Sequence, residues 1–334
     1  MGRPHLPDPW RESNAENATR VAPDRADSVT MARSGTELNI QHRVPLSRLT
    51  TVGIGGPALA VARPETLAEL ERALAWAEER ELPVVPIGLG SNVLVADEGL
   101  DALVIRLAGE LASVRIDGDL LLAGGGAANA VCLHRARAVG LGGLEFACAI
   151  PGTAGGGVRM NAGAYGGEWK GVANRALVAG PDGARWLTRD ELELSYRHSA
   201  LRSGEVVAQV EFRLAPRPSG EIKATVTDLQ RQRKATQPTN KRTFGSVFKN
   251  PEHELGAGRM LDASGLKGFR VGDAVISSRH ANFIENAGGA RAADAIALMV
   301  EARRRALEGF GVVLEREVEL LGPLELPPVA EGGR

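Results

Sequence analysis

The 334-residue sequence has few cysteines, few aromatic residues and no long hydrophobic run. Its two cysteines, Cys132 and Cys148, form neither a CxxC pair nor a metal-ligand spacing, so we expect small core residues of a reduced protein and no metal site. The longest uncharged runs, 82–96 and 120–134, reach 15 residues, short of the ~20 that a transmembrane helix requires. Forty basic and 41 acidic side chains leave a net charge of −1, which gives no electrostatic reason to expect nucleic acid or a membrane as a partner.

The first 34 residues contain four prolines, balanced charges and almost no large aliphatic side chains. Such a composition cannot bury enough apolar surface to fold, so the sequence predicts a disordered extension over residues 1–35. The segment also lacks the apolar stretch of a secretory signal, and we therefore expect a cytoplasmic protein. Met31 precedes the first patterned segment, which leaves open whether the functional chain begins there.

Glycine is in excess: 41 of 334 residues, about 12%, against a usual ~7%. Residues 88–167 hold 18 of them, in groups separated by short apolar runs. Glycine-rich turns after strands are typical of sites where backbone N–H groups surround a phosphate. There is no Walker A sequence, and Gly53-Ile-Gly55-Gly-Pro-Ala58 is not a Rossmann fingerprint because Pro57 denies it the required helix start. The glycines alone leave two alternatives, a large phosphorylated ligand or a turn-rich scaffold.

From residue 44 onward, strand and helix patterns alternate without forming a regular βαβ series, which predicts an α+β protein with mixed sheets. Val206–Leu214 alternates as a half-buried strand, and Thr188-Arg-Asp-Glu191 predicts the start of a short helix through a capping box. Pro216–Gly220 is the best internal boundary. We expect helices over 65–80, 127–139, 221–235 and 292–308 and a terminal strand over Val312–Leu321.

Several longer strings are more specific than any lone glycine motif. The longest are Ile150-Pro-Gly-Thr-Ala-Gly-Gly-Gly-Val-Arg-Met-Asn-Ala-Gly-Ala-Tyr-Gly166 and Gly245-Ser-Val-Phe-Lys-Asn-Pro251. The others are Ile87–Val95, Gly143–Phe146, Ser195–Ser199, Ala281–Ile284 and Leu314–Val318. With these strings, over about residues 44–322, the chain resembles the UDP-N-acetylenolpyruvoylglucosamine reductase family of peptidoglycan precursor synthesis. It is similar to the type II branch, because no room exists between Trp186 and Arg197 for the extra loop of type I enzymes.

The resemblance implies an FAD-binding fold of the vanillyl-alcohol-oxidase (PCMH) type over residues 44–217, in two α+β subdomains of about 44–110 and 111–217. A C-terminal α+β substrate domain over 220–322 and a flexible tail over 323–334 would follow. The family's reaction passes hydride from NADPH through FAD to the enolpyruvyl group of a UDP-amino sugar. We expect non-covalent FAD because the glycine loops contain no histidine, and we expect a monomer acting on small molecules.

Reduction of an enol ether conjugated to a carboxylate requires hydride at the β-carbon, stabilisation of the charge that develops on the carboxylate, and a proton at the α-carbon. The resemblance assigns the proton donor to Ser246, the carboxylate contact to Arg197 and the polarising acid to Glu317. Their alternatives are a turn serine, a surface ion pair and a solvated strand charge, since Glu315 and Glu319 share the face of Glu317 at period two.

The resemblance also predicts binding residues. Substrate contacts are expected at Tyr196 and Asn250, and phosphate contacts at Lys249 and Lys234, although a solvated helix face is an equally good interpretation for each lysine. Residues 221–245 hold six basic and two acidic side chains, which suits the phosphates of UDP and NADPH. The predicted FAD contacts are Gly88, Gly90, Ser91, Asn92, Gly124, Gly152, Thr153, Gly155, Gly156, Asn161 and Gly163.

Two other functions remain open from the sequence. One is an FAD oxidase of the same fold that acts on a small alcohol or sugar. The other is a non-catalytic flavin or nucleotide-sugar sensor. Consumption of NADPH with the enolpyruvyl substrate would distinguish the reductase from both.

Overall fold

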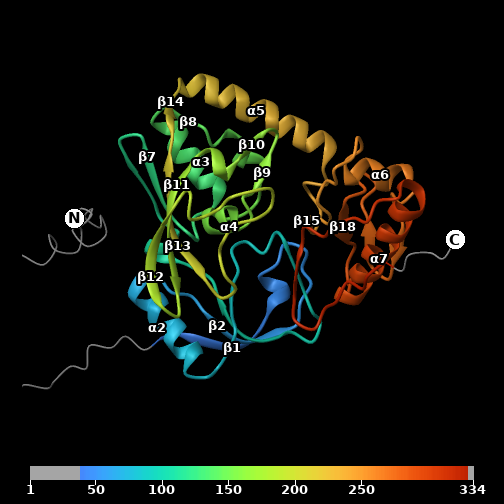
Figure 1. Ribbon diagram of the computed structural model, residues 1–334, viewed down its shortest axis with the longest axis horizontal. Helices are drawn as coiled ribbons and strands as arrows, with labels where there is room; N and C mark the ends of the chain where they lie inside the picture. The colour runs from blue at the N-terminus through green and yellow to red at the C-terminus, as the bar shows by residue number, and fades with distance from the viewer. Residues whose placement is uncertain (1–37, 330–334) are drawn as a thin grey trace, which may run out of the picture. The chain divides into compact units, whose positions relative to one another are not determined.

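The computed structural model describes residues 38–329 (Figure 1). The predicted extension over 1–35, Met31 and the last five residues of the predicted tail lie outside the described residues. None of the helices within 38–329 is long and apolar enough to cross a membrane. The elements alternate between helix and strand in mixed sheets, which confirms the predicted α+β class.

The first sheet combines parallel and antiparallel pairs. β2, β5 and β3 are parallel, and β1 pairs with β2 in the antiparallel sense. Helix α2 (Leu67–Glu78) begins after Thr66, whose side chain accepts a hydrogen bond from the Glu69 N–H, and buries Leu70 and Leu74. It confirms the helix predicted over 65–80. In spatial order the strands are β1 (Ile40–Pro45), β2 (Pro57–Ala62), β5 (Leu100–Ile105) and β3 (Val84–Pro86).

The second sheet is antiparallel and is covered on both faces. Its central strand β13 (Val206–Arg213) confirms the strand predicted over Val206–Leu214, but it is buried along nearly its whole length, so the predicted half-burial is wrong. Val207 and Phe212 pack in one core, whereas Val206 and Ala208 pack in another on the opposite side. Helix α3 (Asn129–Ala138) confirms the helix predicted over 127–139. The spatial order is β12 (Gly183–Thr188), β11 (Ala173–Gly180), β13, β7 (Leu120–Gly124) and β6 (Val114–Asp117).

The capping box at Thr188 forms, but no helix follows it. The Thr188 N–H donates to the Glu191 carboxylate at 2.8 Å, and the Glu191 N–H donates to the Thr188 hydroxyl at 3.4 Å, as a capping box requires. The chain then turns at Glu193, which has a φ of 45°. A left-handed residue cannot continue a right-handed helix, so the predicted short helix is a single turn.

A long helix, α5 (Ser219–Thr236), follows the proposed boundary at Pro216–Gly220 and runs toward β15 and α6 (Figure 1). Its buried residues Ile222 and Val226 belong to the core beneath the second sheet. The first half of the helix therefore packs on the core beneath the second sheet.

Two short strand pairs lie near the second sheet. β8 (Leu141–Gly142) pairs with β14 (Ala215–Pro216), and β9 (Gly163–Ala164) pairs with β10 (Gly167–Glu168).

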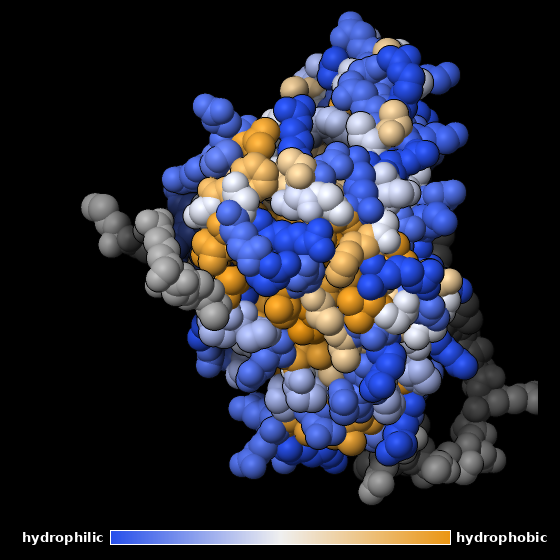
Figure 2. All heavy atoms as spheres, turned by 90° about the vertical axis from the view of Figure 1, so that its right-hand side faces the viewer, coloured by the Kyte–Doolittle hydropathy of each residue, from blue (hydrophilic) through white to orange (hydrophobic). Residues whose placement is uncertain are grey.

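The C-terminal part is a four-stranded antiparallel sheet with helices α6 (Ala257–Ala263) and α7 (Ala292–Phe310). Figure 2 shows its outer face, where hydrophobic residues gather at the centre among hydrophilic ones. The predicted terminal strand is too long, because β19 covers only Glu319–Leu321 and pairs in parallel with β4 (Val93–Val95). The sheet order is β15 (Thr243–Ser246), β18 (Phe283–Asn286), β17 (Ala274–Ile276) and β16 (Arg270–Val271).

Candidate active site

A cavity of about 390 Å³ is lined by residues of the first and second sheets. The turn after β3, the turn after β7 and the start of helix α4 (Ala154–Arg159) form much of its wall. Of the residues predicted to bind the cofactor, Gly88, Thr153, Gly155 and Gly156 line this cavity, together with Gly125 and Gly126. Gly124 does not line it, because Gly124 ends β7 and its Cβ position lies 2.3 Å from the Leu111 backbone.

The turn over residues 88–92 presents free backbone donors. Among the residues that the structure describes, the N–H groups of Gly88 through Asn92 have no hydrogen-bond acceptor. Gly90 adopts a φ of +65°, and a Cβ there would lie 2.1 Å from the Leu49 carbonyl oxygen, so only glycine fits. Several successive free N–H groups in a turn are suited to an anion such as a diphosphate.

The start of α4 differs from the expectation that both glycine loops present free amides. The Ala154 N–H donates to the Ala127 carbonyl and the Gly155 N–H to the Gly125 carbonyl. The Gly156 N–H reaches the Thr153 hydroxyl at 3.4 Å. A Cβ at Gly155 would lie 3.0 Å from the Gly125 carbonyl oxygen, and one at Gly157 would lie 2.4 Å from the Trp169 ring. These two glycines therefore allow close packing and do not present free donors, whereas a Cβ at Gly156 would make only an ordinary contact, at 3.5 Å.

The cavity is also lined by three arginines, Arg63, Arg106 and Arg159. The sequence did not predict them as cofactor contacts. No acidic side chain is among the lining residues within 38–329. Burial lowers the pKa of Arg106, and the neighbouring Arg63 lowers it further. Arg63 and Arg106 each directly follow a parallel strand, β2 and β5, and ligands of such sheets bind beyond the carboxyl ends of the strands. Their position directly after a parallel strand was the feature of the sequence from which these two cofactor contacts could have been predicted.

Four predicted cofactor residues brace the site instead of lining the cavity. The Ser91 hydroxyl donates to the Pro151 carbonyl, and the Asn92 amide donates to the carbonyl of Glu317 at 3.2 Å. Asn161 is fully buried, and its amide donates to the Ser195 carbonyl at 2.9 Å. The Gly152 carbonyl accepts a hydrogen bond from the backbone N–H of Asn129.

Arg197 and Glu317, which are 120 positions apart in the sequence, form a partly buried ion pair. Arg197 Nε lies 2.7 Å from Glu317 Oε1, and both side chains are only 16% exposed. The Arg197 Nη2 also donates to the carbonyl of Gly163. Gly163, which was predicted to contact the cofactor, therefore contacts Arg197. Arg197 has a φ of 54°, a left-handed conformation that turns its side chain back toward the pair.

Ser246 lies at the end of β15, beside the glycine turn. A Cβ at the preceding Gly245 would lie 3.2 Å from the carbonyl oxygen of Ser91, so the two segments are in close contact. The next residue, Val247, accepts a hydrogen bond from the Glu317 N–H at 2.8 Å. The fold therefore brings Ser246, Arg197 and Glu317 to one place, next to the turn over residues 88–92.

Glu317 is not on a strand face with Glu315 and Glu319, because β19 begins only at Glu319. Glu315 is 71% exposed and pairs with Lys249, whereas Glu317 is enclosed. Burial raises the pKa of Glu317, and the charges of Arg197 and Lys249 oppose that shift. Glu317 is therefore an enclosed carboxyl group paired with Arg197, and the alternative of a solvated strand charge is excluded.

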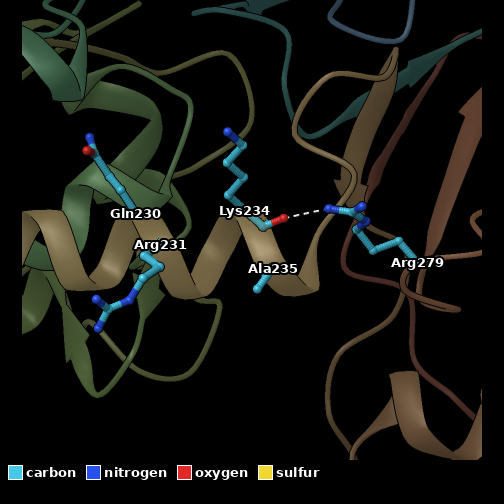
Figure 3. Close-up of a pocket in the computed structure, with 5 residues that line it drawn as sticks. All are labelled: Gln230, Arg231, Lys234, Ala235 and Arg279. Carbon is cyan, nitrogen blue, oxygen red and sulfur yellow. Dashed lines mark hydrogen bonds between the residues drawn. The ribbon is translucent and has the colours of Figure 1, made fainter.

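The predicted substrate residues lie in two groups. The Tyr196 hydroxyl accepts a hydrogen bond from the Asn250 N–H at 3.2 Å, so these two residues and Lys249 lie near the ion pair. Lys234 lies apart, in an open pocket of about 450 Å³ at the end of α5. Figure 3 shows Arg279 reaching from the C-terminal part toward the Lys234 carbonyl, to which it donates at 2.6 Å.

The fold and the cavity, with its free amides, glycines and arginines, define a flavin-binding protein. Comparison with known protein families gives the same class. Residues 58–180 match an FAD binding domain, and residues 237–321 match the C-terminal domain of UDP-N-acetylenolpyruvoylglucosamine reductase. A reductase of this name from Symbiobacterium thermophilum is 44% identical over 285 residues, 85% of this chain and 92% of its own. The corresponding protein of Anaeromyxobacter dehalogenans is 45% identical and covers 85% of both chains.

A solved structure gives the same result. The crystal structure of UDP-N-acetylenolpyruvylglucosamine reductase from Thermus caldophilus superposes with a TM-score of 0.75 at 39% identity, covering 85% of this chain and 100% of that one. The chain belongs to the UDP-N-acetylenolpyruvoylglucosamine reductase family. It is therefore an FAD-dependent oxidoreductase, and the family's reaction belongs to peptidoglycan synthesis.

Proposed function

We propose that the chain reduces enolpyruvyl-UDP-N-acetylglucosamine to UDP-N-acetylmuramate with electrons from NADPH, and that it does so in the cytoplasm as a monomer. The observation that carries this proposal is the partly buried Arg197–Glu317 pair beside Ser246, adjacent to the turn over residues 88–92. An acid, a cation and a hydroxyl are the groups that reduction of a conjugated enol ether requires.

The cavity fits the diphosphate of FAD. The N–H groups of Gly88 and Leu89 and the arginines Arg63 and Arg106 would hold its phosphates, while Gly155 and Gly156 would allow their close approach. When bound, FAD supplies hydride transfer between NADPH and the β-carbon of the substrate. No histidine lies in these loops, so the flavin is held without a covalent bond.

The protein's own residues would then perform the remaining steps. The Arg197 guanidinium binds the substrate carboxylate and stabilises the negative charge that develops there. Glu317, with its raised pKa, shares a proton or hydrogen bond with that carboxylate as it becomes an enediolate. The Ser246 hydroxyl donates its proton to the α-carbon, and solvent or a neighbouring group returns a proton to the serine oxygen.

The UDP part of the substrate would extend toward the end of α5. Lys234 and Arg279 place two cations around the open pocket there, with Arg231 on the same helix (Figure 3). Cations in this arrangement are suited to a diphosphate. Tyr196 and Asn250 would orient the sugar between this pocket and the ion pair.

The test is an NADPH oxidation assay with purified flavin-containing protein and the enolpyruvyl substrate. We expect turnover that requires the substrate, and a loss of about 100-fold or more in Ser246→Ala, the scale of a lost general acid. Ser264→Ala is the matched control, because the Ser264 hydroxyl only caps α6 by donating to the Met260 carbonyl. Oxygen-dependent turnover of a small alcohol would instead indicate an oxidase, and tight flavin binding without turnover would indicate a sensor.

A further inference from the structure

Asn282, in the turn that leads into β18, makes three hydrogen bonds to the segment that carries Ser246. Its side-chain Oδ1 accepts from the Phe248 N–H at 2.9 Å, and its Nδ2 donates to the Phe248 carbonyl at 2.8 Å. Its own carbonyl accepts from the Val247 N–H at 2.9 Å. Asn282 is 3% exposed, so water does not compete for these bonds.

The carboxamide of Asn282 replaces a missing piece of the β ladder. β15 ends at Ser246, and its pairing with β18 shifts register between Thr243 and Ser246, where Gly245 adopts a φ of +83°. The N–H and carbonyl of Phe248 would therefore be left without partners, although Phe248 is 1% exposed. A primary amide offers one donor and one acceptor side by side, as a peptide group does, and satisfies both.

The opposite edge of the same segment holds Glu317. The Glu317 N–H donates to the Val247 carbonyl at 2.8 Å, and the Lys249 N–H donates to the Glu315 carbonyl at 2.9 Å. The backbone over 246–249 thus lies between the Asn282 amide and the strand-like stretch that ends in Glu317. A shift of this backbone would move the hydroxyl of Ser246 and the carboxyl of Glu317 relative to each other and to the turn over residues 88–92.

We infer that Asn282 is a positioning residue for protonation of the substrate: it fixes the backbone that sets Ser246 and Glu317 in place. The inference rests on the proposed function. It assigns Asn282 to one half of the reaction only, because reduction of FAD by NADPH uses neither the Ser246 proton nor the Glu317 carboxyl. Transfer from reduced FAD to the enolpyruvyl group uses both.

Asn282→Asp is the most direct test, because it keeps the shape of the side chain but replaces the donor to the Phe248 carbonyl with a second oxygen. Asn286→Asp, at the last residue of β18, is the matched control. Asn286 is also buried, its Nδ2 donates to the Val52 carbonyl at 3.0 Å, and its Oδ1 accepts from the Gly288 and Ala290 N–H groups. It makes no hydrogen bond to residues 246–249.

The two half-reactions are measured separately by rapid mixing without oxygen, following the flavin absorbance of the purified holoenzyme. For Asn282→Asp we expect flavin reduction by NADPH at the wild-type rate and reoxidation by substrate slowed about 10- to 100-fold, the cost of misplacing a reacting group by ~1 Å. The solvent deuterium isotope effect on reoxidation should increase, because proton transfer then limits that step. Asn286→Asp should keep the wild-type ratio of the two rates.

Wild-type reoxidation in Asn282→Asp would overturn the inference, as would equal slowing of both half-reactions or an equal effect of Asn286→Asp. Should Asn282→Asp fail to fold, Asn282→Ser allows the same comparison with a smaller uncharged side chain. The wild-type enzyme tests the proposed function separately: reduced wild-type flavin that the substrate does not reoxidise contradicts that function before any variant is compared.

Discussion

Gly156 offers a test of where the flavin diphosphate binds that separates binding from folding. Gly156 is in helix α4 and lines the cavity of about 390 Å³. The nearest atom to an added Cβ is the Thr153 hydroxyl oxygen at 3.5 Å, an ordinary van der Waals contact. Because alanine is favoured over glycine within a helix by ~0.5–1 kcal/mol, Gly156→Ala should leave the flavin-free protein as stable as the wild type or slightly more stable.

The same methyl group would reduce the space available to the ligand. It occupies the side of the cavity where Gly155 and Gly156 would allow a phosphate to approach the backbone. Overfilling a packed contact costs ~1–3 kcal/mol, which corresponds to a flavin Kd raised about 5- to 150-fold. We expect this loss of affinity without any loss of stability.

The assay is fluorescence titration of FAD into flavin-free protein, together with a thermal melt of that protein. Gly157→Ala is the control, because its Cβ would lie 2.4 Å from a ring carbon of Trp169 and Gly157 does not line the cavity. It should lower the Tm of the flavin-free protein instead. Wild-type flavin affinity in Gly156→Ala would refute the assignment of the diphosphate to this cavity.

Three further predictions address other parts of the chain. Burial raises the pKa of Cys132 to about 12 and also raises that of the half-buried Cys148. The thiolate fraction of Cys132 is then ~10⁻⁴ near pH 8, so a thiol reagent should label Cys132 only after denaturation. Rapid labelling of Cys132 in the native protein would contradict its burial. The raised pKa of Glu317 means that the folded state holds this proton more strongly than the unfolded chain, so its contribution to the unfolding free energy should decline as pH rises from the ordinary carboxyl range through the raised value. Glu317→Gln should remove that decline in urea titrations at a series of pH values, and an unchanged pH profile would contradict the assignment. Deletion of residues 1–30 should leave NADPH oxidation intact, and a large loss of activity would show that the segment takes part.

Ser246, Arg197 and Glu317 stay a prediction for the catalytic group, which the sequence suggests because each lies in a string shared with the family. Ser246 follows Gly245, which has a φ of +83° at the register shift of β15, and Arg197 has a left-handed φ of 54° in the turn closed by the Ser195–His198 bridge. The sequence does not show that Arg197 and Glu317 pair with each other, because 120 positions separate them. Only the folded chain brings Arg197 Nε within 2.7 Å of Glu317 Oε1.

Two amide side chains of the glycine loops have backbone partners within the protein in addition to the cofactor contact predicted for them. Asn92 was expected to contact FAD, but its amide reaches the Glu317 carbonyl, 225 positions away. Asn161 was expected to close over the cofactor, but it is buried against the Ser195 carbonyl. An asparagine in a loop has donors and acceptors that satisfy either a ligand or a distant backbone, and local sequence does not distinguish the two.

These long-range bonds give the site its rigidity. Val52, Ile54 and Leu94, all from the N-terminal half, are buried in the core of the C-terminal part, and the Thr51 hydroxyl donates to the Thr243 carbonyl at 2.6 Å. The turn that follows β3 is therefore joined, through residues 49–54, to the strand that carries Ser246. Separating the N-terminal half from the C-terminal part would expose these three aliphatic side chains, each of which contributes ~1.5–3 kcal/mol when buried. The shared core therefore fixes the distance between the turn over residues 88–92 and Ser246.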